Sequence, residues 1–224
     1  MRNHLAIVAL LSMILGGTPV FAGRIEAAGG QAPSTHPVQA PPLQVPAETP
    51  APGNPVVTVS TSLGDITLEL FKDRAPVSVD NFIRYVAEGF YEGTVFHRVK
   101  KGFMIQGGGY TADLAEKPTH PPIQNEATNG LRNLRGTLAM ARRMTLRSAT
   151  AQFYINVADN RMLDHTGYSP DEFGYAVFGR VLTGMDVVDR IVSVATTTAG
   201  EMEDVPVQPV IIKRVRVVKP APVP

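Results

Sequence analysis

The 224-residue chain contains no cysteine, which removes several chemistries at once. Disulfide bonds, catalytic thiolates, zinc ribbons, iron–sulfur clusters and lipid attachment through cysteine all need that side chain. The chain also lacks an excess of charge of one sign, since 21 Lys and Arg stand against 20 Asp and Glu. A nucleic-acid-binding protein usually presents a basic excess on one face, so this balance argues against that class.

Other catalytic patterns are missing as well. The sequence has no G-x-S-x-G elbow for a serine nucleophile, and no pair of carboxylates stands out as acid and base. Its histidines beyond residue 22 show no metal-ligand spacing. A G-x-G-x-x-A match at residues 107–112 is followed by prolines rather than by a helical pattern, so it does not predict a dinucleotide site. The sequence therefore offers no candidate for a metal or a cofactor.

The first 22 residues have the three parts of a secretory signal peptide. Arg2 supplies their only charge, residues 5–15 are almost wholly apolar, and small residues precede a cut after Ala22. The apolar run is shorter than the roughly 20 residues that a membrane-spanning helix needs. We therefore expect residues 1–22 to be removed on export, and an uncleaved membrane anchor is the alternative.

A proline-rich stretch follows this signal. Residues 23–55 hold eight prolines, only three charges and no aromatic residue. Such a segment cannot bury enough apolar surface to offset the entropy lost on ordering it. We expect a disordered, extended linker, with a proline-rich ligand for another module as the alternative. A single folded domain is then expected over residues 56–220.

Short apolar runs with strand periodicity dominate the rest of the chain. Residues 56–59 and 66–70 flank a glycine-containing turn, which is the pattern of a hairpin. Further strand-like runs follow at residues 94–99, 103–107, 137–141, 153–157, 176–181 and 210–218. These runs predict about eight strands.

Two segments have helical periodicity instead. Residues 77–88 place apolar side chains on one face, with Ser78 expected to cap the start and Gly89 to end the helix. Residues 185–192 predict a second helix. The strands and helices do not alternate as in parallel α/β folds. The pattern therefore indicates a closed antiparallel barrel or a sandwich.

One segment carries a candidate site. Residues 96–109 read F-H-R-V-K-K-G-F-M-I-Q-G-G-G, two strand-like runs joined by a basic turn. Arg98 would lie beside apolar side chains, and the amide of Gln106 can hydrogen bond to a guanidinium. The glycines allow another backbone to approach closely. The segment predicts an apolar pocket with one fixed cation, and a surface strand whose arginine pairs with a carboxylate is the alternative.

The same segment resembles the signature of the cyclophilins, a family of peptidyl-prolyl cis–trans isomerases. Residues 136–141 (G-T-L-A-M-A) and 151–155 (A-Q-F-Y-I) resemble further family segments, and the likeness runs in order from about residue 56 to residue 218. Residues 125–135 and 156–165 look most like the bacterial periplasmic branch. We therefore expect a periplasmic protein, with secretion or membrane tethering by an uncleaved signal as the alternatives.

The resemblance implies a mainly β fold, a closed eight-stranded antiparallel barrel capped by two helices, with the substrate groove on its outside. It implies that Arg98 is the catalytic arginine and that Gln106 orients it. Met162 stands where eukaryotic members often have the tryptophan associated with tight cyclosporin binding, so we expect weak binding of that drug. The implied substrate-binding residues are Phe103, Met104, Ala141, Arg142, Gln152, Tyr154, Met162, Leu163 and Tyr175.

The implied activity is rotation about X-Pro bonds in proline-containing peptides and in unfolded exported proteins. It needs no metal or cofactor, because no covalent bond is made or broken. A non-catalytic chaperone or scaffold that binds proline peptides in the same groove is the alternative. The presence of both Arg98 and Gln106 favours the enzyme. We expect the protein to act as a monomer.

Overall fold

The computed structural model describes residues 49–218, so the predicted signal peptide and most of the predicted linker lie outside the described residues. Eight strands form one antiparallel sheet in the order β10-β1-β2-β7-β5-β6-β4-β3, and two further strands form a separate hairpin, β8–β9. No helix among residues 49–218 is both long and apolar enough to cross a membrane. The elements are, in chain order, β1 (Val56–Thr61), β2 (Gly64–Leu70), α1 (Pro76–Ala87), β3 (Thr94–Lys100), β4 (Met104–Thr111), a 3₁₀ turn (Ala127–Asn129), β5 (Thr137–Met140), β6 (Phe153–Asn156), a second 3₁₀ turn (Arg161–Leu163), β7 (Val177–Thr183), α2 (Met185–Val192), β8 (Thr196–Ala199), β9 (Met202–Pro206) and β10 (Ile212–Val218).

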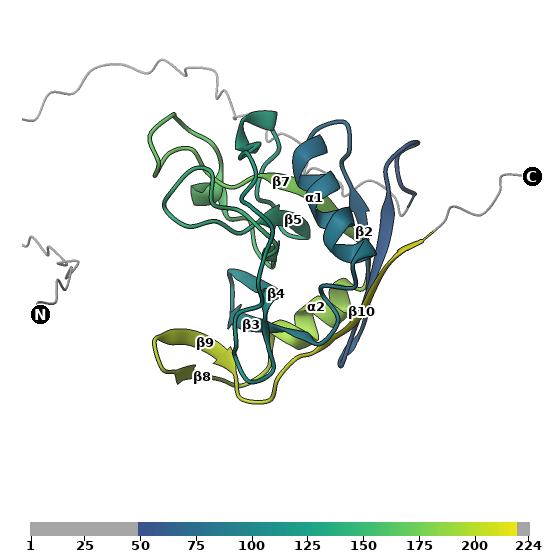
Figure 1. Ribbon diagram of the computed structural model, residues 1–224, viewed down its shortest axis with the longest axis vertical. Helices are drawn as coiled ribbons and strands as arrows, with labels where there is room; N and C mark the ends of the chain where they lie inside the picture. Colours follow the sequence, from purple (N-terminus) through teal and green to yellow (C-terminus); the bar gives the residue numbers. More distant parts are fainter. Residues whose placement is uncertain (1–48, 219–224) are drawn as a thin grey trace, which may run out of the picture. The chain divides into compact units, whose positions relative to one another are not determined.

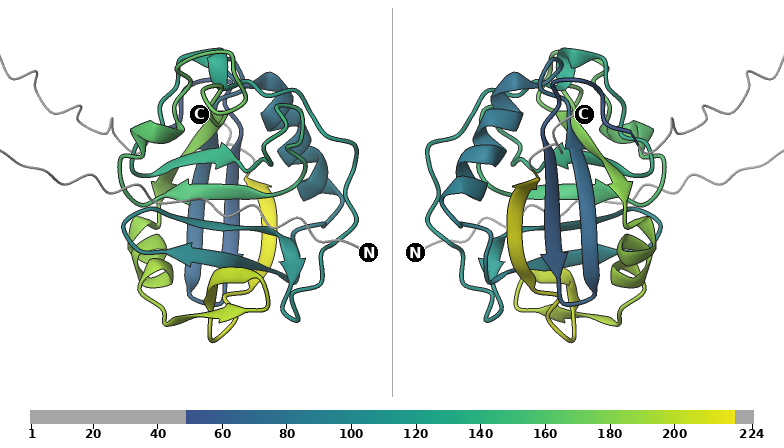
Figure 2. Two further views of the ribbon diagram at one scale, coloured as in Figure 1. Left: turned by 90° about the vertical axis from the view of Figure 1, so that its left-hand side faces the viewer. Right: turned by 90° about the vertical axis from the view of Figure 1, so that its right-hand side faces the viewer.

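The large sheet curls over on itself. Strands β1, β2 and β10 run across the direction of the other strands, and α1 and α2 lie at opposite ends of the curl (Figures 1 and 2). The mainly β, eight-stranded antiparallel fold with two helices is thus confirmed. The description of the barrel as closed is too strong, because the edge strands β3 and β10 meet near one isolated bridge, Val95 to Ile211, and not along a continuous ladder. The β8–β9 hairpin, which the sequence did not predict, lies beside β3 on that side.

Helix α1 starts differently from the sequence-based expectation. It begins with Pro76 at its first turn, a position where the missing backbone N–H of proline costs nothing, and Ser78 lies inside the helix. The N–H groups of its first turn, which have no partner within the helix, donate to a side chain distant in the sequence. The Glu126 carboxylate accepts from the backbone N–H of Val77 at 3.0 Å and of Ser78 at 2.7 Å. Ser78 is therefore not the N-cap. The expected end is confirmed, since Gly89 follows the last turn with φ of 65°.

The strands of the sheet have apolar side chains on both faces, which creates two separate clusters. Along β6, Phe153 and Ile155 belong to the main core inside the curl, where Phe153 packs against Phe82 of α1 with ring centroids 5.5 Å apart. Tyr154, between them, points to the opposite face, as the two-residue period of a strand requires. There it joins a second apolar cluster with Met104, Ala139 and Val177, all buried.

Candidate active site

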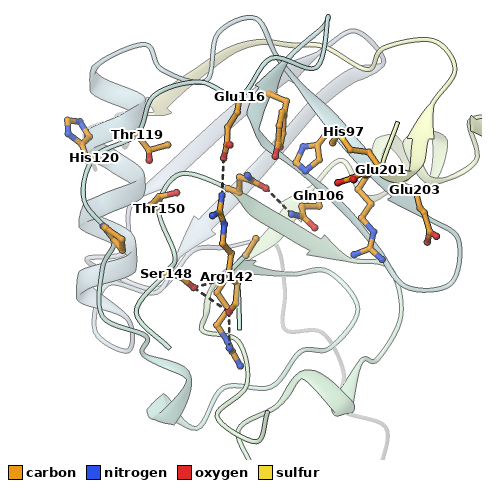
Figure 3. Close-up of a pocket in the computed structure, with 17 residues that line it drawn as sticks. His97, Gln106, Glu116, Thr119, His120, Arg142, Ser148, Thr150, Glu201 and Glu203 are labelled. Atoms are coloured by element: carbon orange, nitrogen blue, oxygen red, sulfur yellow. Dashed lines mark hydrogen bonds and ion pairs between the residues drawn. The ribbon is translucent and has the colours of Figure 1, made fainter. Parts of the chain in front are cut away.

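The β3–β4 hairpin positions the two residues predicted to be catalytic. Arg98 on β3 lies directly opposite Gln106 on β4, and the turn between the strands includes Gly102 in a left-handed conformation with φ of 69°. Both side chains line a groove of about 680 Å³, which also takes in Ala141, Arg142 and Gln152 (Figure 3). Five of the predicted site residues therefore share one concave surface.

Gln106 bonds to a different partner from the one expected. Its amide nitrogen donates to the side-chain oxygen of Gln152 at 2.9 Å, and no hydrogen bond within residues 49–218 joins it to Arg98 (Figure 3). Gln152 fits at this place because Gly109 has no side chain: a Cβ there would lie 2.5 Å from Gln152 Cγ. The missing side chain of Gly109 thus makes room for Gln152. In the same way, the missing side chain of Gly107 makes room for the backbone oxygen of Val95, which would lie 2.9 Å from a Cβ at that position.

The second apolar cluster lies next to this groove and shares Ala141 with it. It brings together six of the nine residues predicted to bind substrate. Met162 is apart from both the groove lining and this cluster, and it is 75% exposed. The predicted residues in the cluster are Phe103, Met104, Ala141, Tyr154, Leu163 and Tyr175.

The hydroxyl group of Tyr154 does not add a free polar atom to this cluster. It donates to the side-chain oxygen of Asn133 at 2.7 Å, and the same oxygen accepts from Asn156 at 3.2 Å. Burial raises the pKa of Tyr154 well above its usual value, so the hydroxyl stays protonated. The ring of Tyr154 packs edge-on against Tyr175, with centroids 6.0 Å apart, and both rings contribute apolar surface.

Arg142 supports the loop at residues 165–173 with its side chain. Its guanidinium lies 4.7 Å from the centre of the Tyr175 ring, and it donates to the backbone oxygens of Pro170 at 2.7 Å and Gly174 at 2.9 Å. A planar guanidinium can stack on a ring and bond at its edge at the same time. Arg142 therefore holds this long loop beside Tyr175.

Comparison with known proteins places this arrangement in a family. Residues 56–217 match the cyclophilin-type peptidyl-prolyl cis–trans isomerase family. This chain belongs to that family. It is 53% identical over 163 residues to peptidyl-prolyl cis-trans isomerase A of Dickeya dadantii, covering 73% of this chain and 84% of that protein. It is 54% identical over 162 residues to peptidyl-prolyl cis-trans isomerase B of Escherichia coli, covering 72% of this chain and 99% of that protein.

A solved structure also resembles this cyclophilin. A cyclophilin-type isomerase of Cryptosporidium parvum, determined in the presence of the dipeptide Ala-Pro, aligns with a TM-score of 0.61 at 25% identity. The alignment covers 73% of this chain and 99% of that one. Sequence and fold therefore agree on the family, and the two bacterial relatives agree with the expected bacterial branch.

The groove of this cyclophilin contains a buried histidine next to Arg98. His97 is only 4% exposed, its ring lies 4.6 Å from the Tyr110 ring, and Nδ1 makes no hydrogen bond within residues 49–218. Burial lowers the pKa of His97 from 6.5 to about 4, so the ring is neutral at pH 7. Within the same part of the chain, no group of three or more His, Asp or Glu side chains could hold a metal ion.

The sequence did not predict the acidic side of the groove. Glu201 and Glu203 of the β8–β9 hairpin line it (Figure 3), and Asp204 of β9 forms an ion pair with Arg98 at 3.6 Å. Arg98 thus has a carboxylate partner, as in the alternative considered for its strand, and lines a groove at the same time. No local pattern could identify Asp204, because it lies 106 positions beyond Arg98 in the chain.

Proposed function

We propose that this cyclophilin isomerises X-Pro bonds in exported, unfolded proteins, that Arg98 is its catalytic residue, and that the second apolar cluster binds the prolyl ring. The observation that carries the proposal is the placement of the Arg98 guanidinium on a groove whose wall continues into that cluster. A fixed cation beside an apolar surface is what the reaction needs. No nucleophile is needed, because no covalent bond changes.

The barrier to the reaction is electronic. Rotation about an X-Pro bond costs roughly 18–20 kcal/mol because the planar amide is stabilised by resonance. In the twisted transition state the nitrogen lone pair is no longer delocalised and can accept a hydrogen bond. A guanidinium beside that nitrogen donates to it only when resonance is lost. The bond is therefore made in the transition state and not in the ground state, which lowers the barrier.

The apolar cluster supports the other half of the proposal. Phe103 and Leu163 lie at its partly buried rim, around the fully buried Met104 and Tyr154. A prolyl ring placed against Phe103 and Leu163 would remove apolar surface from water on both partners. The Cryptosporidium relative was solved in the presence of the dipeptide Ala-Pro, which agrees with proline-containing peptides as ligands of this protein.

The test is exchange NMR on an X-Pro peptide with residues 23–224, wild type beside Arg98→Ala. We expect kcat/KM to fall at least about tenfold, which corresponds to about 1.4 kcal/mol of barrier. Arg214→Ala is a matched control, because Arg214 lies on β10, is exposed and pairs only at 3.8 Å with Glu92. Wild-type activity in Arg98→Ala would refute the role of the arginine.

A second variant separates binding from chemistry. Phe103→Ala removes an aromatic wall and leaves the guanidinium in place, so we expect KM to rise more than kcat falls. A wild-type protein that binds the peptide, seen as chemical-shift changes, and does not accelerate exchange would be a scaffold and not an isomerase. An unchanged KM in Phe103→Ala would place the proline elsewhere.

The cellular part of the proposal rests on the sequence of residues 1–22. We propose cleavage after Ala22 and action in the periplasm as a monomer. Intact mass of the protein recovered from cells expressing the full chain tests the cleavage, and a mass that includes residues 1–22 would contradict it. Fractionation of the cell envelope tests the location. Sedimentation of the purified protein tests the monomer.

A further inference from the structure

We infer that Asp204 of the β8–β9 hairpin positions the Arg98 guanidinium for catalysis. The inference rests on the proposed catalytic role of Arg98 and adds to it a second residue, from an element that the sequence did not predict. Asp204 is a positioning residue, because it acts on the reaction through Arg98 and not by contact with substrate.

The charges around Asp204 support this role. Its Oδ2 atom lies 3.6 Å from Arg98 Nε and 3.9 Å from Lys100 Nζ. Arg98 and Lys100 are two residues apart on β3, so their side chains leave the strand on the same face. Oδ2 is shielded from solvent and makes no hydrogen bond within residues 49–218. The two cations of β3 are therefore the groups that balance this carboxylate.

A bulge in the hairpin aims Asp204 at β3. Thr197 pairs with Val205 and Ala199 pairs with Met202, so two residues of β9 stand opposite one residue of β8. Asp204 is one of these two and has φ of 59°, a left-handed conformation that aspartate tolerates better than most side chains. Bulges redirect side chains next to active sites.

The hairpin that carries the bulge is firmly attached. Val205, next to Asp204, is buried, and the backbone N–H of Val207 donates to Ala195 at 2.9 Å and closes the base of the hairpin. The following segment is tied to β3 by the bond from Phe96 N–H to the Val210 oxygen at 3.0 Å. Asp204 is thus held against β3 by its neighbours, and not only by its own ion pair.

The geometry of the pair leaves the reactive end of Arg98 available. Asp204 approaches Nε, and no hydrogen bond within the described part of the chain uses the two terminal nitrogens of Arg98. Gln106, the residue expected to orient the arginine, donates to Gln152 instead. A carboxylate that restrains the side chain at Nε reduces the conformations open to the guanidinium and leaves its terminal N–H groups facing no protein partner.

The test compares Asp204→Asn with wild type. Asparagine has nearly the same shape and also tolerates positive φ, so the bulge is kept and the charge is lost. Because ion pairs between half-exposed groups are weak, we expect kcat/KM to fall about two- to fivefold, mainly through kcat. Asp186→Asn is the matched control, since it removes an aspartate that pairs with Arg190 on α2, outside the groove lining.

Two readouts separate positioning from a structural role. The ¹⁵Nε–H resonance of Arg98 should shift in Asp204→Asn and stay unchanged in Asp186→Asn. The midpoint of thermal unfolding should be the same in Asp204→Asn as in wild type. If Asp204→Asn lowers both kcat/KM and the midpoint of thermal unfolding, Asp204 acts through the fold, and the inference is overturned.

The direction of the effect also tests the inference. A carboxylate near a guanidinium weakens the positive field that the substrate nitrogen meets, so equal or higher activity in Asp204→Asn would show that Asp204 does not assist Arg98. Measuring Arg98→Ala in the same series keeps the two proposals apart. If Arg98→Ala loses activity and Asp204→Asn does not, only the present inference fails. If Arg98→Ala keeps full activity, the proposed function of Arg98 fails as well.

Discussion

His97 makes the stability of the domain depend on pH in a way that can be calculated. Its pKa is about 4 in the folded protein and 6.5 for a histidine in an unfolded chain, so the unfolded chain binds a proton more readily than the folded one. The free energy of unfolding therefore falls as the pH decreases through the interval between these values. The full difference amounts to about 3 kcal/mol, of which about 2 kcal/mol is lost between pH 7.5 and pH 5.

The variant that tests this reasoning is His97→Gln, which keeps a polar side chain and cannot be protonated. Urea unfolding followed by circular dichroism at pH 7.5, 6.5, 5.5 and 5 gives the free energy for each protein. We expect the wild type to lose about 2 kcal/mol more than His97→Gln over this range. Taking the difference between the two proteins removes the contribution of the other titrating groups.

An exposed histidine provides the control. His120 lies near Glu88 on the surface, and its side chain is 38% exposed. We expect His120→Gln to keep the pH dependence that His97→Gln loses. Parallel curves for wild type and His97→Gln would refute the reasoning, because they would show that His97 is protonated equally easily in the folded and unfolded states.

Two further predictions concern charged side chains that hold the fold together. Glu69 is 1% exposed and accepts hydrogen bonds from Asn54, Ala51 and Arg180, which outweigh the effect of burial and lower its pKa. Glu69→Gln should reduce the free energy of unfolding at pH 7 by about 2–3 kcal/mol in urea titrations, and the gap should narrow as the pH falls through the folded pKa of Glu69. Arg142→Ala should speed amide hydrogen exchange in residues 165–174, because the bonds to Pro170 and Gly174 are lost. Unchanged amide hydrogen exchange in residues 165–174 would mean that the loop is stable without the bonds from Arg142.

Much of the sheet could be predicted from periodicity alone. The eight strands of the curled sheet each show an apolar run bounded by glycine or polar residues, and all eight were expected in the right order. The β8–β9 hairpin was missed for a physical reason. Its first strand is almost entirely exposed, and its second carries a bulge, so neither shows the alternation on which the prediction depends.

The candidate site was predictable where its parts are close in sequence. Arg98 and Gln106 face each other because one short turn joins their strands, and residues 96–109 contain both. Partners far apart in the chain could not be found in this way. The carboxylate that accepts from the first N–H groups of α1 belongs to Glu126, 48 positions from Ser78. The partner of Arg98 is Asp204. Such pairings are set by the folded backbone and leave no local pattern.

The strand order has a consequence for when the protein can fold. Strand β1 lies between β2 and β10, and Val56 is opposite Val218, so residues near the start of the domain pair with residues at its far end. A chain that emerges with its N-terminus first can form the β1–β2 hairpin early, yet one side of β1 stays unpaired until residues 212–218 arrive. An unpaired strand edge is a template for other extended chains. During synthesis, this isomerase therefore remains a chain that itself needs protection until its last strand is in place.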